Sequence, residues 1–238
     1  MRRTGLLLVA VAAITIVTVI GGCSKSEGTK APLSEEPAGR TGGVGAGGAG
    51  ANLNSDGDFV HDVAIKNMAE IELSRMALDK ATSLDIKSFA QTMIDDHGAA
   101  GNTLKSVVSG HPIEWPAQLD EKHLKTADEL GKKQGADFDR DYVKAMIEGH
   151  QDLAAKLESR LDVQSLADWK TAAAGRTQSK ALPEPGAALS DVEVRPDKSD
   201  NEITMKINQW AADTYPVAQK HIDTARTLEN ATKNPTTN

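Results

Sequence analysis

One glutamate and three histidines stand among apolar residues in helical patterns along the chain: Glu72, His97, His150 and His221. Each lies four residues from an apolar side chain, as Glu72 does from Met68 and Met76, and this spacing places both on one helix face. If four helices turn these faces inward, one carboxylate and three imidazoles meet in a shared interior. That set is sufficient to bind a metal ion.

Two interpretations of these polar residues are open. A buried imidazole or carboxylate without a partner costs about 1–3 kcal/mol, so each group needs one. In the first interpretation the groups satisfy one another, or Glu72 pairs with Arg75 three residues further on. In the second they bind a metal, and Asp96 and Tyr142 support the ligands from outside.

The identity of such a metal can be narrowed by ligand type. Di-iron sites in ferritin-like bundles use about four carboxylates and two Glu-x-x-His pairs, and the chain has no Glu-x-x-His. Histidine with nearby methionine suits copper. Covalent haem requires Cys-x-x-Cys-His, which a chain with one cysteine cannot supply; non-covalent haem stays open. The sequence therefore leaves the cofactor open, and in the metal-binding interpretation it is a transition metal, copper or iron.

Other functions find little support in the sequence. No phosphate-binding loop, nucleophile elbow, dinucleotide fingerprint or His-Glu-x-x-His motif is present, which favours a non-enzymatic role. The chain has 34 acidic and 27 basic residues and a net charge of −7. Because nucleic-acid binders carry a basic stripe, we expect no nucleic-acid partner.

The elements that position these residues are predicted to be helices. Aromatic residues make up only 3% of the chain, which disfavours a β-sandwich. Apolar residues recur every three or four positions, which predicts long helices near 58–80, 82–107, 138–160 and 202–228 and a shorter helix near 116–130. An up-and-down four-helix bundle over residues 58–232 follows, with a short additional helix. The pattern at 163–174 is weaker.

Helix ends and breaks are also predicted. Thr82 with Asp85, and Ser199 with Glu202, match capping pairs that open helices. Pro216 should kink the last helix. Residues 175–200 contain three prolines and are expected to form a long insertion loop before the last helix.

The N-terminal sequence predicts the cellular location of the protein. Two arginines followed by an apolar run resemble a secretory signal peptide over residues 1–22. The run ends in Ile20-Gly21-Gly22-Cys23, which resembles a bacterial lipobox. We expect Cys23 to carry lipid and to attach the protein to the membrane, in the bacterial outer membrane facing the periplasm. Residues 23–57 are glycine-rich and predict a flexible tether, and residues 233–238 a disordered tail.

Several segments together resemble a bacterial envelope family, the domain of unknown function 4142. They are Phe59-Val60, MAEIEL at 68–73, FAQTMIDDH at 89–97, FDRDYVKAMIEGH at 138–150, and Pro216 with His221. The resemblance spans most of residues 58–228 and implies a ferritin-like bundle in an exported or outer-membrane protein. It implies no activity. The long segment between Arg160 and Asn201 departs from the family's short connection.

The sequence therefore predicts a lipid-anchored envelope bundle with a non-enzymatic binding or envelope-stress role. The alternative is a ferritin-like protein that binds copper or iron through Glu72, His97, His150 and His221. A third hypothesis is that the 175–200 insertion binds a protein partner, which the sequence does not identify.

Overall fold

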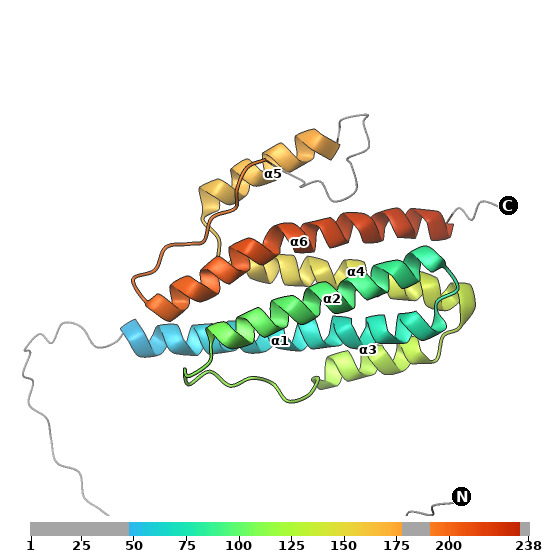
Figure 1. The fold of residues 1–238 in the computed structure, drawn as a ribbon, viewed down its shortest axis with the longest axis horizontal. Coiled ribbons are helices and arrows are strands. Elements are labelled where there is room, and N and C mark those ends of the chain that lie inside the picture. The colour runs from blue at the N-terminus through green and yellow to red at the C-terminus, as the bar shows by residue number, and fades with distance from the viewer. Residues whose placement is uncertain (1–47, 178–190, 234–238) are drawn as a thin grey trace, which may run out of the picture. The chain divides into compact units, whose positions relative to one another are not determined.

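The described part of the chain, residues 48–177 and 191–233 of a computed structural model, is all-helical. Its six helices are α1 (Gly48–Lys80), α2 (Leu84–Val107), α3 (Glu121–Gly131), α4 (Gly135–Glu158), α5 (Val163–Thr177) and α6 (Glu202–Lys233) (Figure 1). The predicted all-α bundle is confirmed. The expected signal peptide, Cys23 and the 234–238 part of the tail lie outside these residues. Within the described ranges, no helix has the length and apolarity needed to span a membrane.

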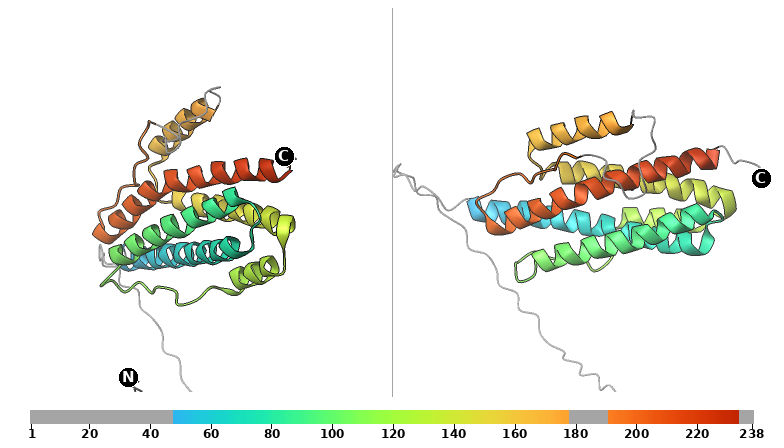
Figure 2. Two further views of the ribbon diagram at one scale, coloured as in Figure 1. Left: turned by 45° about the vertical axis from the view of Figure 1, so that its right-hand side comes forward. Right: turned by 45° about the horizontal axis from the view of Figure 1, so that its top comes forward.

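The four long helices pack so that α1 and α6 each lie beside both α2 and α4. Figures 1 and 2 show α1 and α6 running in one direction and α2 and α4 in the other. Two contacts fix these directions: Arg160, after α4, bonds Asp56 near the start of α1, and Thr82, after α1, bonds Asp139 near the start of α4. The helices therefore do not simply alternate. The connection through α3 returns the chain along the bundle, and ferritin-like bundles contain one such crossover.

The core consists of two apolar clusters. One contains Phe138, Tyr142 and Met146 of α4, and the other contains Leu153 and Leu157 further along the same helix. His150 lies between these two groups and is buried. In α2, His97 likewise follows Met93 of the first cluster and precedes Leu104 of the second. The buried polar residues thus lie in the middle of the bundle, between the two apolar clusters.

The first helix is longer than expected. It begins at Gly48, inside the segment expected to be a tether, and Asp58 lies within it rather than at its start. Asp56 is buried, accepting hydrogen bonds from Arg160 and from the Thr204 hydroxyl. These bonds attach α1 at Asp56, which lies inside the expected tether, to α6 and to the chain just after α4.

The predicted helix caps are displaced by one or two residues. Ser83, not Thr82, caps α2 by accepting from the Ile86 N–H. Asn201, not Ser199, caps α6, with its side-chain oxygen accepting from Ile203 and Thr204. The polar side chain that reaches the free N–H groups is decided by the path of the incoming loop. Helix α6 continues through Pro216.

The segment expected as an insertion contains ordered structure where it is described. The weaker pattern at 163–174 forms α5, which ends at Thr177 and so includes the first three residues of the expected insertion. Residues 195–197, near the other end of the insertion, pair with residues 160–162 before α5. Leu161 and Pro196 form an isolated β-bridge, supported by a hydrogen bond from Asp162 N to Arg195 O. Val194 is buried in the core. Residues 178–190 of the predicted loop lie outside the described ranges.

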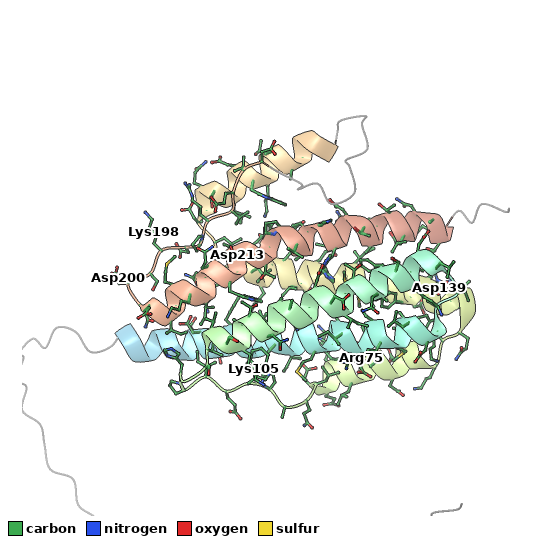
Figure 3. All side chains as sticks on the ribbon, viewed as in Figure 1. Arg75, Lys105, Asp139, Lys198, Asp200 and Asp213 are labelled. Atoms are coloured by element: carbon green, nitrogen blue, oxygen red, sulfur yellow. The ribbon has the colours of Figure 1, made fainter. Side chains whose placement is uncertain are left out.

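A buried carboxylate fixes one end of the bundle. Asp139 of α4 accepts hydrogen bonds from the Thr82 and Ser83 N–H groups and the Thr82 hydroxyl. Figure 3 labels Asp139 at the end where α1, α2 and α4 meet. Because a carboxylate at a helix N-terminus is favoured by the exposed N–H groups, this contact sets the register of α2 against α4.

Candidate metal centre

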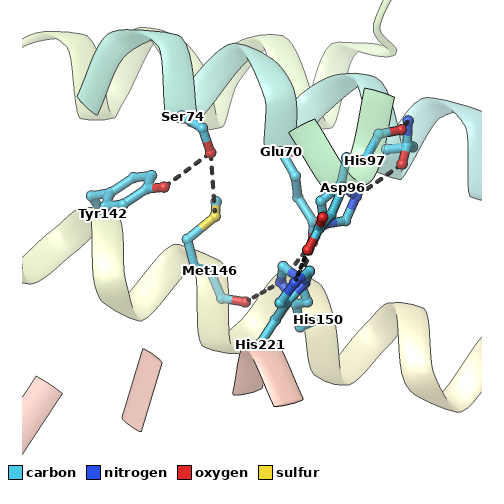
Figure 4. A network of polar contacts seen from close by, with 9 residues as sticks. Glu70, Ser74, Asp96, His97, Tyr142, Met146, His150 and His221 are labelled. Carbon is cyan, nitrogen blue, oxygen red and sulfur yellow. Dashed lines mark hydrogen bonds and ion pairs between the residues drawn. The ribbon is translucent and has the colours of Figure 1, made fainter. Parts of the chain in front are cut away.

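Four helices bring one polar side chain each to a single buried point (Figure 4): Glu70 from α1, His97 from α2, His150 from α4 and His221 from α6. Their exposed fractions are 3%, 5%, 1% and 4% respectively. A ligand atom from each of the three histidines lies within 4.8 Å of the other two. The sequence predicted this convergence of the histidines from three helices, and the structure confirms it.

The outer nitrogen of His97 is held by Asn67. Asn67 Nδ2 donates to the His97 carbonyl oxygen at 2.8 Å, which orients the amide. Its Oδ1 therefore faces His97 Nδ1, also at 2.8 Å. Because Oδ1 only accepts, His97 Nδ1 carries the hydrogen and Nε2 carries the lone pair.

The outer nitrogens of the other two histidines also donate hydrogen bonds to oxygen atoms. His150 Nδ1 donates to the Met146 carbonyl oxygen at 2.9 Å, and His221 Nε2 donates to the Asp96 carboxylate at 2.9 Å. In the neutral imidazoles, His150 Nε2 and His221 Nδ1 are then the lone-pair nitrogens. All three lone pairs point inward, as in metal sites whose histidines donate their second N–H to an oxygen.

The spacing of these nitrogens suits an ion. His150 Nε2 lies 3.1 Å from His97 Nε2 and 3.1 Å from His221 Nδ1. Two lone pairs cannot form a hydrogen bond, so these contacts require a shared proton or a cation. Ligand nitrogens about 2.0–2.1 Å from a metal are separated by about 3.0 Å in octahedral and 3.3 Å in tetrahedral coordination. The observed separations lie between these values.

Glu70 completes the cluster from α1. Its Oε2 lies 3.1 Å from His97 Nε2, and its Oε1 lies 3.2 Å from His150 Nδ1. Neither contact has hydrogen-bond geometry, and both oxygens are buried without another partner. Burial raises the pKa of Glu70 to about 8, against an opposing effect of Lys66. Because Oε2 faces the lone pair of His97 Nε2, that contact needs a proton or a metal between the two atoms. Oε1 instead faces His150 Nδ1, whose hydrogen is donated to the Met146 carbonyl oxygen.

The histidines resist protonation in the absence of a metal. Burial lowers the pKa of His150 to about 3, with a further contribution from His221. Burial and the two neighbouring imidazoles also lower the pKa of His97, and burial lowers that of His221 despite its bond to Asp96. Neutral imidazole is the form that binds a metal.

Two glycines make space for the cluster. A Cβ at Gly149 of α4 would lie 2.7 Å from Glu70 Oε1, and a Cβ at Gly101 of α2 would lie 2.7 Å from Asn67 Nδ2. Both glycines are in helix interiors, where glycine costs about 1 kcal/mol relative to alanine. The space for the two polar side chains is therefore obtained at a cost in helix stability.

Glu72, the carboxylate predicted from sequence, does not join the cluster. It is exposed and lies 3.8 Å from Arg75 in a surface ion pair. The prediction followed Met68 and Met76, but the buried stripe of α1 instead runs through Val63, Asn67, Glu70, Ser74 and Ala77. Side chains two positions apart on a helix point in directions that differ by about 200°, so Glu72 lies on the opposite side of α1 from Glu70. In the sequence, the three- and four-residue spacing of these small and polar residues was the signal that could have identified the buried face of α1.

Of the two residues predicted to support the ligands, Asp96 contacts a histidine and Tyr142 does not. Asp96 accepts from His221 Nε2, as described above, and its side chain is 45% exposed. Tyr142 lies one α4 turn before Met146, and its hydroxyl is 2.9 Å from Ser74 Oγ. That hydroxyl thus reaches α1 beside the cluster rather than a histidine.

The stability of the metal-free chain should depend on pH in two opposing ways. Below about pH 6.5 the unfolded histidines bind protons that the folded ones exclude, so acidification lowers the free energy of unfolding. Between about pH 4.5 and pH 8 folded Glu70 retains a proton that the unfolded chain releases, so its contribution decreases as the pH rises. Three histidines outweigh one glutamate in acid, and we expect maximum stability near neutral pH.

Urea unfolding of the chelator-treated protein from pH 5 to pH 9 tests this expectation. In the Glu70→Gln variant, the free energy of unfolding should no longer decrease between neutral pH and pH 8. Its decrease in acid should remain. An unchanged alkaline limb in this variant would contradict the assigned role of Glu70.

Alanine substitutions of the glycines beside two of the histidines should distinguish the effect of lost space on stability from the effect of increased helix propensity. Gly98→Ala in α2 has nothing within 4 Å of the new Cβ, and should raise the free energy of unfolding by about 0.5–1 kcal/mol. Gly149→Ala gains the same propensity but displaces the buried Glu70 carboxylate, so we expect a net loss of about 1 kcal/mol or more. Chemical denaturation compares the two, and equal stabilisation would show that Glu70 is not confined.

Comparison with known proteins identifies one family. Residues 44–180 match the family described as Domain of unknown function (DUF4142). The matched stretch includes Glu70, His97 and His150 and ends before α6, which supplies His221. No curated protein and no solved structure matches the chain.

Proposed function

Because the chain belongs to the DUF4142 family, whose description assigns no activity, its function has to be inferred from the buried cluster, and we propose that the protein binds one divalent transition metal ion. The ligands are His97 Nε2, His150 Nε2, His221 Nδ1 and a carboxylate oxygen of Glu70. The observation that carries the proposal is the inward direction of three imidazole lone pairs, 3.1 Å apart in two of the three pairs.

Mutual satisfaction of the side chains is the competing explanation, and the hydrogen count argues against it. A protonated Glu70 could donate to His97 Nε2, but the contact between His150 Nε2 and His221 Nδ1 would still lack a hydrogen. One additional proton on His150 or His221 would satisfy that contact, yet burial lowers the pKa of both histidines, that of His150 to about 3. A metal ion satisfies all these atoms together.

The donor set favours a borderline ion. Three imidazole nitrogens and one carboxylate oxygen suit Zn²⁺, Cu²⁺ or Fe²⁺ rather than a soft ion such as Cu⁺, which prefers sulfur. Met146 acts through its carbonyl oxygen on His150, and its sulfur lies 4.0 Å from Ser74 Oγ. One nearby carboxylate is also too few for a di-iron centre. Copper and iron, the metals expected from sequence, stay candidates in their divalent states.

Metal analysis of the full-length chain tests this function. After equilibration with Zn²⁺ or Cu²⁺ and gel filtration, we expect one ion per chain by mass spectrometry, and none in His97→Ala/His150→Ala. Glu70→Gln should weaken binding on the order of 100-fold, or about 2.7 kcal/mol, in a competition titration.

Glu72→Gln is the matched control, because it removes the same charge from the same helix on the exposed side. It should bind the metal as the wild type does. Equal affinities for both glutamine variants, or a wild-type protein that binds no ion while circular dichroism shows it folded, would contradict the proposal.

We also propose that this metal-binding bundle is attached to the envelope through lipid on Cys23, as a non-enzymatic binding protein in the outer membrane facing the periplasm. The support is the lipobox-like sequence before Cys23 and the apolar run that precedes it. Intact-mass measurement of the protein from bacterial membranes should give a chain that starts at Cys23 with added acyl mass. Cys23→Ala should abolish that addition; a chain of unchanged length and mass would contradict the anchor.

A further inference from the structure

A small cavity, lined mostly by residues of α2 and α6 with Val63 and Asn67 of α1 and Leu153 of α4, lies against the histidine cluster. Its volume is about 20 Å³, which is enough for one water molecule. Of the cluster residues, His97 and His221 line it, and Asn67 and Asp96 also belong to its lining. The cavity therefore touches two of the proposed ligands on the side where α2 and α6 face each other.

The cavity adjoins a groove through which it can be reached. A groove of about 710 Å³ follows α2 and α6. Six residues line both spaces: Asp96, Ala100, Trp210, Thr214, Val217 and His221. The exposed Asp96 side chain and the 40% exposed Val217 stand at this boundary.

The histidine rings are most widely separated on this same side. The His97 and His221 ring centroids are 5.7 Å apart, compared with 5.0 Å for His97 and His150 and 5.1 Å for His150 and His221. The two close pairs meet edge to face, whereas the wide pair is tilted by 36°. The arrangement is thus open between His97 and His221, next to the cavity.

Glu70 occupies a different side of the cluster. It lines a separate cleft of about 160 Å³ together with Lys66, Lys122 and Gly149, between α1, α3 and α4. Glu70 therefore lines that cleft and does not line the cavity beside His97 and His221. Four protein ligands close a tetrahedral site, but the 3.1 Å spacings equally suit a higher coordination number.

From this arrangement we infer that the metal keeps one coordination position open toward the cavity, and that this position takes a water-sized, uncharged ligand supplied through the α2–α6 groove. The inference rests on the proposed metal site. The cavity volume limits the ligand to about the size of water. Charge disfavours anions, because Asp85, Asp96 and Asp213 line the groove against one lysine, Lys220. An accessible position of this kind separates a site that can exchange small ligands from a purely structural one.

Electron paramagnetic resonance of the Cu²⁺-loaded full-length chain in ¹⁷O-enriched water tests the inference. We expect hyperfine coupling to imidazole nitrogens, and additional ¹⁷O broadening from water bound to the metal. Ala100→Leu, which fills the boundary between cavity and groove, should reduce the ¹⁷O broadening at least tenfold while the nitrogen coupling remains.

Ala99→Leu is the matched control, because Ala99 lines the groove but not the cavity. It should retain the wild-type broadening. If Ala100→Leu does not fold, Thr214→Leu fills the same boundary from α6, and the same loss is expected.

The spectrum distinguishes the two proposals. Nitrogen coupling without ¹⁷O broadening in the wild type would overturn the open position and leave the metal site intact. Unreduced broadening in a folded Ala100→Leu or Thr214→Leu variant would overturn the proposed route. Absence of imidazole nitrogen coupling would overturn the metal site and the inference together.

Discussion

The structure depends on one constraint: a buried neutral imidazole has a single hydrogen, and in each of these three histidines that hydrogen is committed to an oxygen outside the cluster. Asn67, the Met146 carbonyl and Asp96 accept the three hydrogens. The inner nitrogens therefore face one another as acceptors. Since acceptors repel when nothing lies between them, the centre of the bundle is arranged for a positively charged occupant.

The fold brings the polar side chains together by taking them from different helices. Each of the four long helices supplies one side chain, and the crossover through α3 allows α2 and α4 to run parallel while both contact α1 and α6. Apolar clusters lie on both sides of the polar layer. Contacts at both ends, through Asp139 and Asp56, fix the registers that bring the four side chains to one level.

The proposed metal site combines buried ligands with a neighbouring cavity. The histidines proposed as ligands are buried and are held by acceptors outside the cluster, which stabilises their orientation. The 20 Å³ cavity beside His97 and His221 nevertheless shares six lining residues with a groove in the surface. The family match covers the helices that carry Glu70, His97 and His150. Helix α6, beyond that match, supplies the third imidazole and one wall of the groove.

The sequence by itself determined the helical class, the approximate helices and the three interior histidines, because three- and four-residue spacing of apolar side chains is a local property. It also carried the lipobox-like segment, which lies outside the described residues. Only the tertiary structure decided that Glu70 rather than Glu72 joins the histidines. On α1 the methionines favoured one face, whereas packing buried a stripe with Asn67, Glu70 and Ser74. Glycines on two other helices make room for this stripe, and no pattern within α1 records space provided by a partner helix.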